Sequence, residues 1–161
     1  MKKIEHLING KLNSNFVNNT SSVFNPATGE EASQVVLGTE KCVHDAVNSA
    51  KNAHISWSSE TPLMRSRKMF KLKEIIESRK NELAELITLE HGKTFDDALG
   101  EVGRGLEVVE FACGIPNLLA GNYTSEVGRS IDSWSDNQPL GIVAGITPFN
   151  FPVMVPLWMF P

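Results

Sequence analysis

A continuous apolar run between two prolines constrains the fold of this chain most strongly. The run is LGIVAGIT, and it is bounded by Pro139 and Pro148. An uninterrupted apolar strand is typical of a parallel sheet whose two faces are both covered, so the run predicts a buried strand of an α/β fold. The stretch FPVMVPLWMFP follows, and we expect a helix to begin near Pro152, with Pro156 as a kink or a boundary.

A parallel sheet needs a second strand after the crossover helix, and no residues are left for one before Pro161. We therefore expect the chain to be the front part of a larger α/β protein, truncated within its first β-α-β unit.

The first part of the chain carries helical patterns. Apolar residues recur at helical spacing over 40–56, and Thr39 before them is a suitable N-cap. A second pattern starts after the pair Thr61-Pro62, which is typical of a helix start. The spacing slips over 78–81, where the sequence is polar, so we predict two helices there rather than one.

The helix after this break is predicted to end at Gly92, which suits a C-cap. A further pattern begins at Asp96 or Asp97 and ends near Gly114. Its apolar stripe consists of Leu99, Val102, Leu106, Val109 and Cys113. Glycines inside it each cost about 1 kcal/mol relative to alanine, which close packing against another backbone would offset.

Extended segments are expected on both sides of these helices. The pair Asn9-Gly10 predicts a turn between two short extended segments, and NPATGE predicts another turn. After Gly121, the stretch YTSEVGRSIDSWSD mixes β-branched, aromatic and polar residues in rough alternation, which predicts one or two exposed strands.

Composition argues against several classes of function. The chain has 15 basic and 19 acidic residues, so it lacks the basic field that nucleic acid requires. Cys42 and Cys113 lack the spacing of a disulfide framework or a zinc site, and we predict no metal ligands. MKKIEHLING resembles neither a signal nor a transit peptide, and no apolar stretch is long enough to span a bilayer. We expect a cytoplasmic chain, or a mitochondrial matrix protein if the source is eukaryotic.

Two nucleotide-binding motifs are excluded. HGKT at 91–94 resembles the end of a phosphate loop, but Ile87 stands where that loop needs glycine. The chain also lacks the G-x-G-x-x-G fingerprint of dinucleotide-binding folds. Cys42 and Cys113 both lack an activating neighbourhood that would make them nucleophiles.

Asn150 stands between two phenylalanines and two prolines in TPFNFP, directly after the predicted strand. One interpretation is a turn residue, because asparagine is common where strands end. The other is functional, because ligands of open α/β sheets bind beyond the carboxyl ends of the strands. A rigid amide at this place can donate a hydrogen bond to an oxygen that becomes negative during a reaction.

Several motifs together resemble the aldehyde dehydrogenase superfamily. PLGIVAGITPFNFPVMVPLWMFP is similar to its strand followed by a Pro-aromatic-Asn-Phe-Pro turn. NPATGE, LEHGKT and EVGRGLEVVEFACG are similar to the CoA-acylating methylmalonate-semialdehyde dehydrogenase branch. The resemblance covers essentially the whole chain. It implies the N-terminal part of an aldehyde dehydrogenase fold, with a Rossmann-like NAD-binding domain and oligomerisation strands.

The resemblance implies NAD-dependent, CoA-acylating oxidative decarboxylation of methylmalonate or malonate semialdehyde, giving propionyl-CoA or acetyl-CoA in valine and inositol catabolism. NAD is the implied cofactor and CoA the co-substrate. The family's nucleophilic cysteine would lie beyond Pro161, so the chain alone is expected to be inactive. Two other functions stay open: a general NAD-dependent aldehyde dehydrogenase, and a short non-catalytic interaction module.

The resemblance also assigns residues. Asn150 matches the family's oxyanion donor, and the flanking phenylalanines and prolines would fix the amide and exclude water. Thr147 and Phe149 match positions that contact the nicotinamide cofactor, and Ile146 is expected beside them. Arg104 matches an arginine that binds the carboxylate of the substrate.

Arg104 has a second interpretation from the residues alone. On a helical wheel it lies opposite the apolar stripe, near Asp97, Glu101 and Glu107, where it would belong to a solvated face with ion pairs.

Three regions follow from the resemblance. Residues 1–120 would form the helical and hairpin part of the NAD-binding domain, and 121–137 the oligomerisation strands. Residues 138–161 would form the first strand and helix of the Rossmann-like core. The oligomerisation strands would reach a neighbouring subunit, which implies a homo-oligomer, a dimer of dimers at full length.

Overall fold

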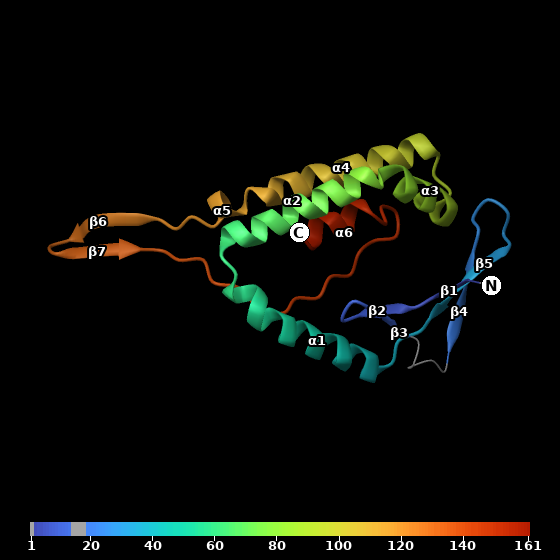
Figure 1. Cartoon of the computed structure of the whole chain (residues 1–161), viewed down its shortest axis with the longest axis horizontal. Helices are drawn as coiled ribbons and strands as arrows, with labels where there is room; N and C mark the ends of the chain where they lie inside the picture. The colour runs from blue at the N-terminus through green and yellow to red at the C-terminus, as the bar shows by residue number, and fades with distance from the viewer. Residues whose placement is uncertain (1, 14–18) are drawn as a thin grey trace.

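The computed structural model describes residues 2–13 and 19–161, which form a helical layer, short sheets and a projecting hairpin (Figure 1). The strands are β1 (Lys2–Ile4), β2 (His6–Ile8), β3 (Lys11–Asn13), β4 (Thr20–Phe24), β5 (Glu31–Val36), β6 (Tyr123–Gly128) and β7 (Ile131–Trp134). The helices are α1 (Glu40–Ser59), α2 (Pro62–Ser78), α3 (Lys80–His91), α4 (Phe95–Cys113), α5 (Ile115–Leu118) and α6 (Met154–Met159).

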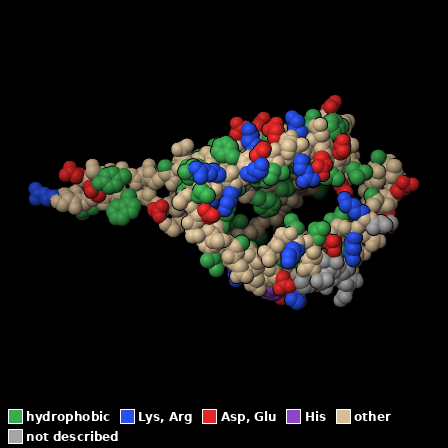
Figure 2. Space-filling model, viewed as in Figure 1, with side chains coloured by type: hydrophobic (Ala, Val, Ile, Leu, Met, Phe, Trp, Pro, Cys, Tyr) green, Lys and Arg blue, Asp and Glu red, His purple; other side chains and the backbone are tan. Residues whose placement is uncertain are grey.

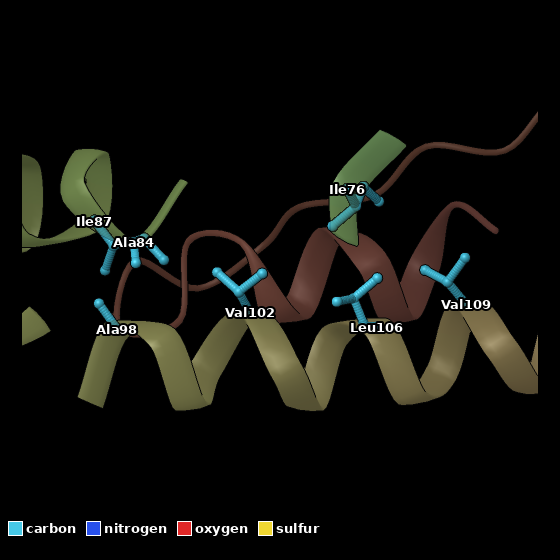
Figure 3. Close-up of a cluster of buried hydrophobic side chains, with 7 residues drawn as sticks. All are labelled: Ile76, Ala84, Ile87, Ala98, Val102, Leu106 and Val109. Atoms are coloured by element: carbon cyan, nitrogen blue, oxygen red, sulfur yellow. The ribbon is translucent and has the colours of Figure 1, made fainter. Parts of the chain in front are cut away.

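The helices α2, α3, α4 and α6 pack together and enclose the main hydrophobic core (Figure 1, Figure 3). The apolar stripe of α4 faces the other helices, as its spacing predicts. The buried core side chains are Ile76, Ala84, Ile87, Ala98, Val102, Leu106 and Val109. Val153 and Leu157 pack against this core, so the core fixes α6 and the turn before it onto α4.

Threonine side chains begin the three longest helices. Thr39, Thr61 and Thr94 each accept a hydrogen bond of 3.3 Å from the backbone N–H three residues later. The predicted starts of α1 and α2 are thereby confirmed, whereas α4 begins at Phe95, slightly earlier than predicted. Gly92 has φ 84° and confirms the predicted C-cap of α3.

The predicted break between α2 and α3 is also confirmed. Arg79 separates the two helices with a φ of −113° and a ψ of 15°. The helix α1 continues to Ser59, beyond its predicted end at residue 56. Of the helices in the described residues, none is both long and apolar enough to cross a membrane.

Short strands form the N-terminal region. In one sheet β5 lies in the middle, parallel to β1 and antiparallel to β4. The strands β2 and β3 form an antiparallel hairpin, as predicted from the pair Asn9-Gly10. Asn9 and Gly10 have φ values of 52° and 69°, which the turn between two adjacent strands requires and which asparagine and glycine tolerate.

The strands β6 and β7 form an antiparallel hairpin that extends away from the rest of the molecule (Figure 1). Both strands are almost entirely exposed, which confirms the predicted exposed strands. The phenolic O–H of Tyr123 donates to Asp132 at 2.6 Å, and the Glu126 N–H donates to the same carboxylate at 2.9 Å. These bonds lower the pKa of Asp132.

The prediction of a buried strand between Pro139 and Pro148 is wrong for this structure. Residues 135–148 have no regular secondary structure, and Leu140, Val143 and Ile146 are 97%, 71% and 95% exposed. The segment crosses an open hollow between α1 and the helical layer (Figure 1, Figure 2). None of the described strands pairs with it through backbone hydrogen bonds, so its apolar sequence has no sheet to join.

The helix after this segment is confirmed, with a different role for one proline. The helix α6 begins at Met154, shortly after Pro152, and Pro156 lies inside its first turn rather than at a boundary. Proline is tolerated there because the first N–H groups of a helix have no acceptor within the helix.

Gly105 lies where α4 touches α6. A Cβ atom at this position would be 2.7 Å from Cδ1 of Leu157 and 3.4 Å from Cα of Met154. A Cβ atom at Gly103, on the same helix, would meet no atom within 4 Å. The expected close packing of a helical glycine therefore occurs at Gly105 and not at Gly103.

Replacing Gly105 by valine is expected to push α6 away from α4 and to lower the free energy of unfolding by roughly 1–3 kcal/mol. Gly103→Val is the matched control, and it should raise that free energy slightly, by under about 1 kcal/mol, because valine favours a helix somewhat more than glycine does. Chemical denaturation measures both values. Equal stabilisation by the two substitutions would show that α6 does not pack on Gly105.

Candidate active site

Asn150 lies in the turn between the extended segment and α6, and its side chain is exposed. Ile146 and Phe149 are 95% and 87% exposed, and Thr147 is half-buried. The predicted site residues of this segment therefore lie in one accessible stretch. The expectation that the phenylalanines exclude water stays a prediction, because no described residue covers Phe149.

Lys93 connects this turn to the helical layer. It lies between the cap of α3 and the first residue of α4, and its side chain is 15% exposed. Its Nζ donates to Oε2 of Glu101 at 2.6 Å and to the backbone carbonyl of Asn150 at 2.7 Å. The same ammonium lies 3.9 Å from the ring centroid of Phe151, which is a close cation–π contact.

Glu101 is fully buried in α4, and its carboxylate is satisfied from two directions. Oε2 accepts from Lys93, and Oε1 accepts from the backbone N–H groups of Val153 and Met154 at 2.9 and 3.2 Å. Burial alone would raise the pKa of this carboxyl. The hydrogen bonds from Lys93, Val153 and Met154 and the charge of Lys93 outweigh burial, so the pKa is lowered.

The placement of Glu101 on a solvated face is thus wrong. Its signal in the sequence is spacing: Glu101 follows Ala98 by three residues and precedes Gly105 by four, and all three are buried on one side of α4. Small residues on both sides leave room for a longer side chain against a neighbouring backbone. Lys93 was not predicted as a site residue, because HGKT was excluded as a phosphate loop and the resemblance of LEHGKT assigned no role to its lysine.

Arg104 is exposed and lies on the same side of α4 as the Asn150 turn. Its guanidinium carbon is 5.9 Å from the centroid of the Phe151 ring. Together with Lys93, Asp97 and Phe151 it lines a cavity of about 240 Å³. Within the described residues Arg104 forms no ion pair with Asp97 or Glu107, so the arrangement leaves its donors available to a ligand.

The model of the aldehyde dehydrogenase family matches residues 14–161. The chain belongs to the aldehyde dehydrogenase family. The two cationic side chains beside the Phe151 ring are thus features of an aldehyde dehydrogenase chain.

The names of relatives of this aldehyde dehydrogenase chain state a particular substrate. A malonate-semialdehyde dehydrogenase of Pseudomonas aeruginosa is 45% identical over 161 residues, which are 100% of this chain and 32% of that enzyme. The malonate-semialdehyde dehydrogenase of Bacillus cytotoxicus is also 45% identical, over 100% of this chain and 33% of that enzyme. The chain therefore spans about a third of the length of these curated relatives.

Solved structures agree with the family. The methylmalonate-semialdehyde dehydrogenase of Oceanimonas doudoroffii superposes with a TM-score of 0.96 at 52% identity, covering 99% of this chain and 33% of that one. A Sinorhizobium meliloti 1021 protein described as a methylmalonate-semialdehyde dehydrogenase, solved with NAD, gives a TM-score of 0.96 at 46% identity with the same coverage. The predicted aldehyde dehydrogenase fold is confirmed, and this chain represents about a third of it.

Exposed apolar surface and a cavity lie together at Phe149 of this aldehyde dehydrogenase chain. Ile146 and Phe149 present exposed apolar surface on either side of Thr147 and Pro148. Phe149 also lines a cavity of about 400 Å³ with Glu90, His91 and Pro152. An exposed aromatic face beside a concave surface suits a flat heteroaromatic ligand.

Neither cysteine of this aldehyde dehydrogenase chain is accessible to a substrate. Cys42 and Cys113 are both free and buried. Burial raises the pKa of the Cys113 thiol, and the nearby Glu110 carboxylate raises it further, while the Lys73 charge acts in the opposite direction. A buried, protonated thiol is a poor nucleophile.

Proposed function

We propose that this chain is part of a CoA-acylating aldehyde dehydrogenase that oxidises methylmalonate or malonate semialdehyde with NAD and releases carbon dioxide. The product is propionyl-CoA or acetyl-CoA, formed in valine and inositol catabolism. The names of relatives at 45% and 52% identity support this substrate class. The observation that carries the proposal is the exposed Asn150 turn, which Lys93 and Glu101 attach to α4 beside Arg104.

Asn150 is the proposed oxyanion donor. When a thiolate adds to the aldehyde carbonyl, the carbonyl oxygen becomes negatively charged, and Nδ2 of Asn150 donates a hydrogen bond to it. A donor that is already in position loses little energy to reorganisation, and one such bond is typically worth about 3 kcal/mol in the transition state.

Arg104 is the proposed partner of the substrate's carboxylate. Its planar guanidinium can donate two parallel hydrogen bonds to a carboxylate, which a lysine cannot do. The nearby Phe151 ring limits where the guanidinium can lie. This contact would select aldehydes that carry an acid group.

Ile146, Thr147 and Phe149 are the proposed contacts of the nicotinamide end of NAD. NAD, when bound, supplies the acceptor for the hydride that leaves the aldehyde carbon. The exposed rings and methyl groups of this stretch orient that end and keep water from it once the remaining walls of the site are present.

The chain by itself is expected to be inactive, because its two cysteines are buried and the nucleophile must come from elsewhere in the complete enzyme. The complete enzyme here means a polypeptide of the relatives' length that contains this chain. The hairpin of β6 and β7 is the proposed contact with a neighbouring subunit, in a dimer of dimers. We propose a cytoplasmic location.

The activity is tested with the complete enzyme, methylmalonate or malonate semialdehyde, and NAD, with and without CoA. NADH formation is measured by absorbance and the acyl-CoA product by mass spectrometry. The proposal expects NADH and propionyl-CoA or acetyl-CoA in equal amounts and strong dependence on CoA. A free carboxylic acid formed at full rate without CoA would instead identify a general aldehyde dehydrogenase that hydrolyses its thioester.

Arg104→Met should reduce kcat/KM for the semialdehydes by roughly ten- to hundredfold, the value of a hydrogen-bonded charge contact. Propanal, which has no carboxylate, is the matched substrate and should be used at an unchanged rate. Steady-state kinetics of both substrates give the ratio. An unchanged preference for the semialdehydes over propanal would show that Arg104 does not bind the carboxylate of the substrate.

A further inference from the structure

We propose that Lys93 and Glu101 are positioning residues, which hold the Asn150 amide in place for the reaction. The inference rests on the proposed function, because it takes Asn150 as the oxyanion donor. Lys93 acts on the backbone carbonyl of Asn150 and Glu101 on the backbone a few residues after it, and neither needs to touch the substrate.

Lys93 fixes the turn at Asn150 itself. Its ammonium donates to the Asn150 carbonyl at 2.7 Å, and this fixes the peptide plane next to the Cα atom that carries the amide side chain. Among the described residues, Lys93 is the one side chain that hydrogen-bonds the backbone between Thr147 and Asn150. Its contact with the Phe151 ring, at 3.9 Å, restrains the next residue as well.

Glu101 fixes the far end of the same turn. Its Oε1 accepts from the N–H groups of Val153 and Met154, while its Oε2 holds Lys93 at 2.6 Å. One buried carboxylate therefore orients the lysine and anchors the first residues of α6. Between the two anchors stands Pro152, whose ring restricts φ, so few backbone angles stay free.

The anchors are themselves rigid. Glu101 lies in α4 beside Ala98 and Val102, which are both fully buried in the core. Lys93 follows the left-handed cap Gly92 and precedes Thr94, whose side chain caps α4. By contrast, the exposed Phe149 makes no such packing. The position of the amide thus depends on this network more than on its apolar neighbours.

The test is a set of four versions of the complete enzyme: unchanged, Glu101→Gln, Asn150→Ala, and the double variant. Glutamine keeps the shape of Glu101 and an acceptor for the N–H groups, but it removes the charge that holds Lys93. Glu101→Gln is expected to lower kcat roughly tenfold or more with little change in KM for NAD, since small misplacements of reacting groups cost up to about a hundredfold. In the Asn150→Ala variant the same substitution should change kcat by less than about twofold, because the amide that Glu101 positions is already absent.

The inference would be overturned if the effects of the two substitutions on the activation free energy were additive, so that their factors in kcat multiply. An unchanged kcat for Glu101→Gln would overturn it as well. Glu110→Gln is the control, because Glu110 lies on the same helix and pairs with Lys73 at 3.2 Å on the surface; its kcat should not change. If Glu101→Gln does not fold, Lys93→Arg replaces it in the same cycle. Arginine keeps a positive charge beside Glu101, but its larger planar head group holds the Asn150 carbonyl differently, so it should lower kcat only where Asn150 is present. Unchanged kcat in Asn150→Ala alone would reject the oxyanion role, whereas a loss there with additive effects would reject only the positioning role.

Discussion

Replacing Asn150 by alanine is expected to lower kcat of the complete enzyme by roughly 10²–10³-fold, the loss seen when one oxyanion donor is removed. KM for the aldehyde should change little, because the negative charge develops only in the transition state. The thermal midpoint should also stay the same, since the side chain of Asn150 is exposed and supports no packing.

The control for this substitution is Asn117→Ala, which removes another exposed asparagine, on α5. It should leave kcat and the thermal midpoint unchanged. Stopped-flow measurement of NADH formation separates the chemical step from product release. Equal rates of this step in the Asn150→Ala variant and the unchanged enzyme would show that Asn150 is a turn residue without a catalytic role.

Replacing Lys93 by methionine is expected to lower the free energy of unfolding by roughly 3–5 kcal/mol at pH 7, because it leaves the buried Glu101 carboxylate without its charged partner. Lys71→Met is the matched control. Lys71 and Glu74 form a 2.8 Å pair with side chains 62% and 70% exposed, and such a pair contributes under about 1 kcal/mol. Urea denaturation of the two variants measures the difference.

The loss of unfolding free energy that Lys93→Met causes should become smaller as the pH falls from 7 to 5. In the unchanged protein the pKa of Glu101 lies below its ordinary value of 4.5. The Glu101 carboxylate therefore contributes fully to stability above pH 4.5, and this contribution is lost as the pH falls through the lowered pKa of the folded protein. Without Lys93 the effect of burial dominates and raises this pKa, so acid protonates Glu101 and removes the unpaired charge. A deficit that stays constant or grows on acidification would show that Glu101 does not depend on Lys93.

The parts of the fold that depend on local chemistry could be predicted from the sequence. A threonine before a helix and a glycine after one act within a single turn, so Thr39, Thr61 and Gly92 were identified from their neighbours alone. The stripe of α4 followed from its spacing, because it packs against helices on one side only. The Asn9-Gly10 hairpin is equally local.

The buried strand before Pro148 could not be predicted correctly, since a strand depends on a neighbouring strand and not on its own residues. The hydrophobic pattern predicted that Leu140 and Val143 belong to a buried sheet, but the described residues contain no sheet that this segment joins. The same segment therefore stays exposed in this structure.

In the candidate site, the sequence indicates Asn150 through its place after the predicted strand and through the resemblance, and Arg104 through the resemblance. It does not indicate Lys93 and Glu101, which hold the Asn150 turn. Glu101 is a charged side chain, and a helical wheel places charges in water unless a partner is known. That partner, Lys93, belongs to another segment, and the N–H groups that Glu101 also binds belong to a third. The spacing of Glu101 from Ala98 and Gly105 indicates its burial, but its partners come from other segments and are identified only in the folded structure.

A crystal structure of the complete enzyme with NAD and a semialdehyde bound to its nucleophile would measure the distance from Nδ2 of Asn150 to the former carbonyl oxygen. The oxyanion role requires a distance of about 2.7–3.1 Å, with the Lys93 bond to the Asn150 carbonyl intact. An amide that points away from this oxygen, at a distance beyond about 4 Å, would contradict that role.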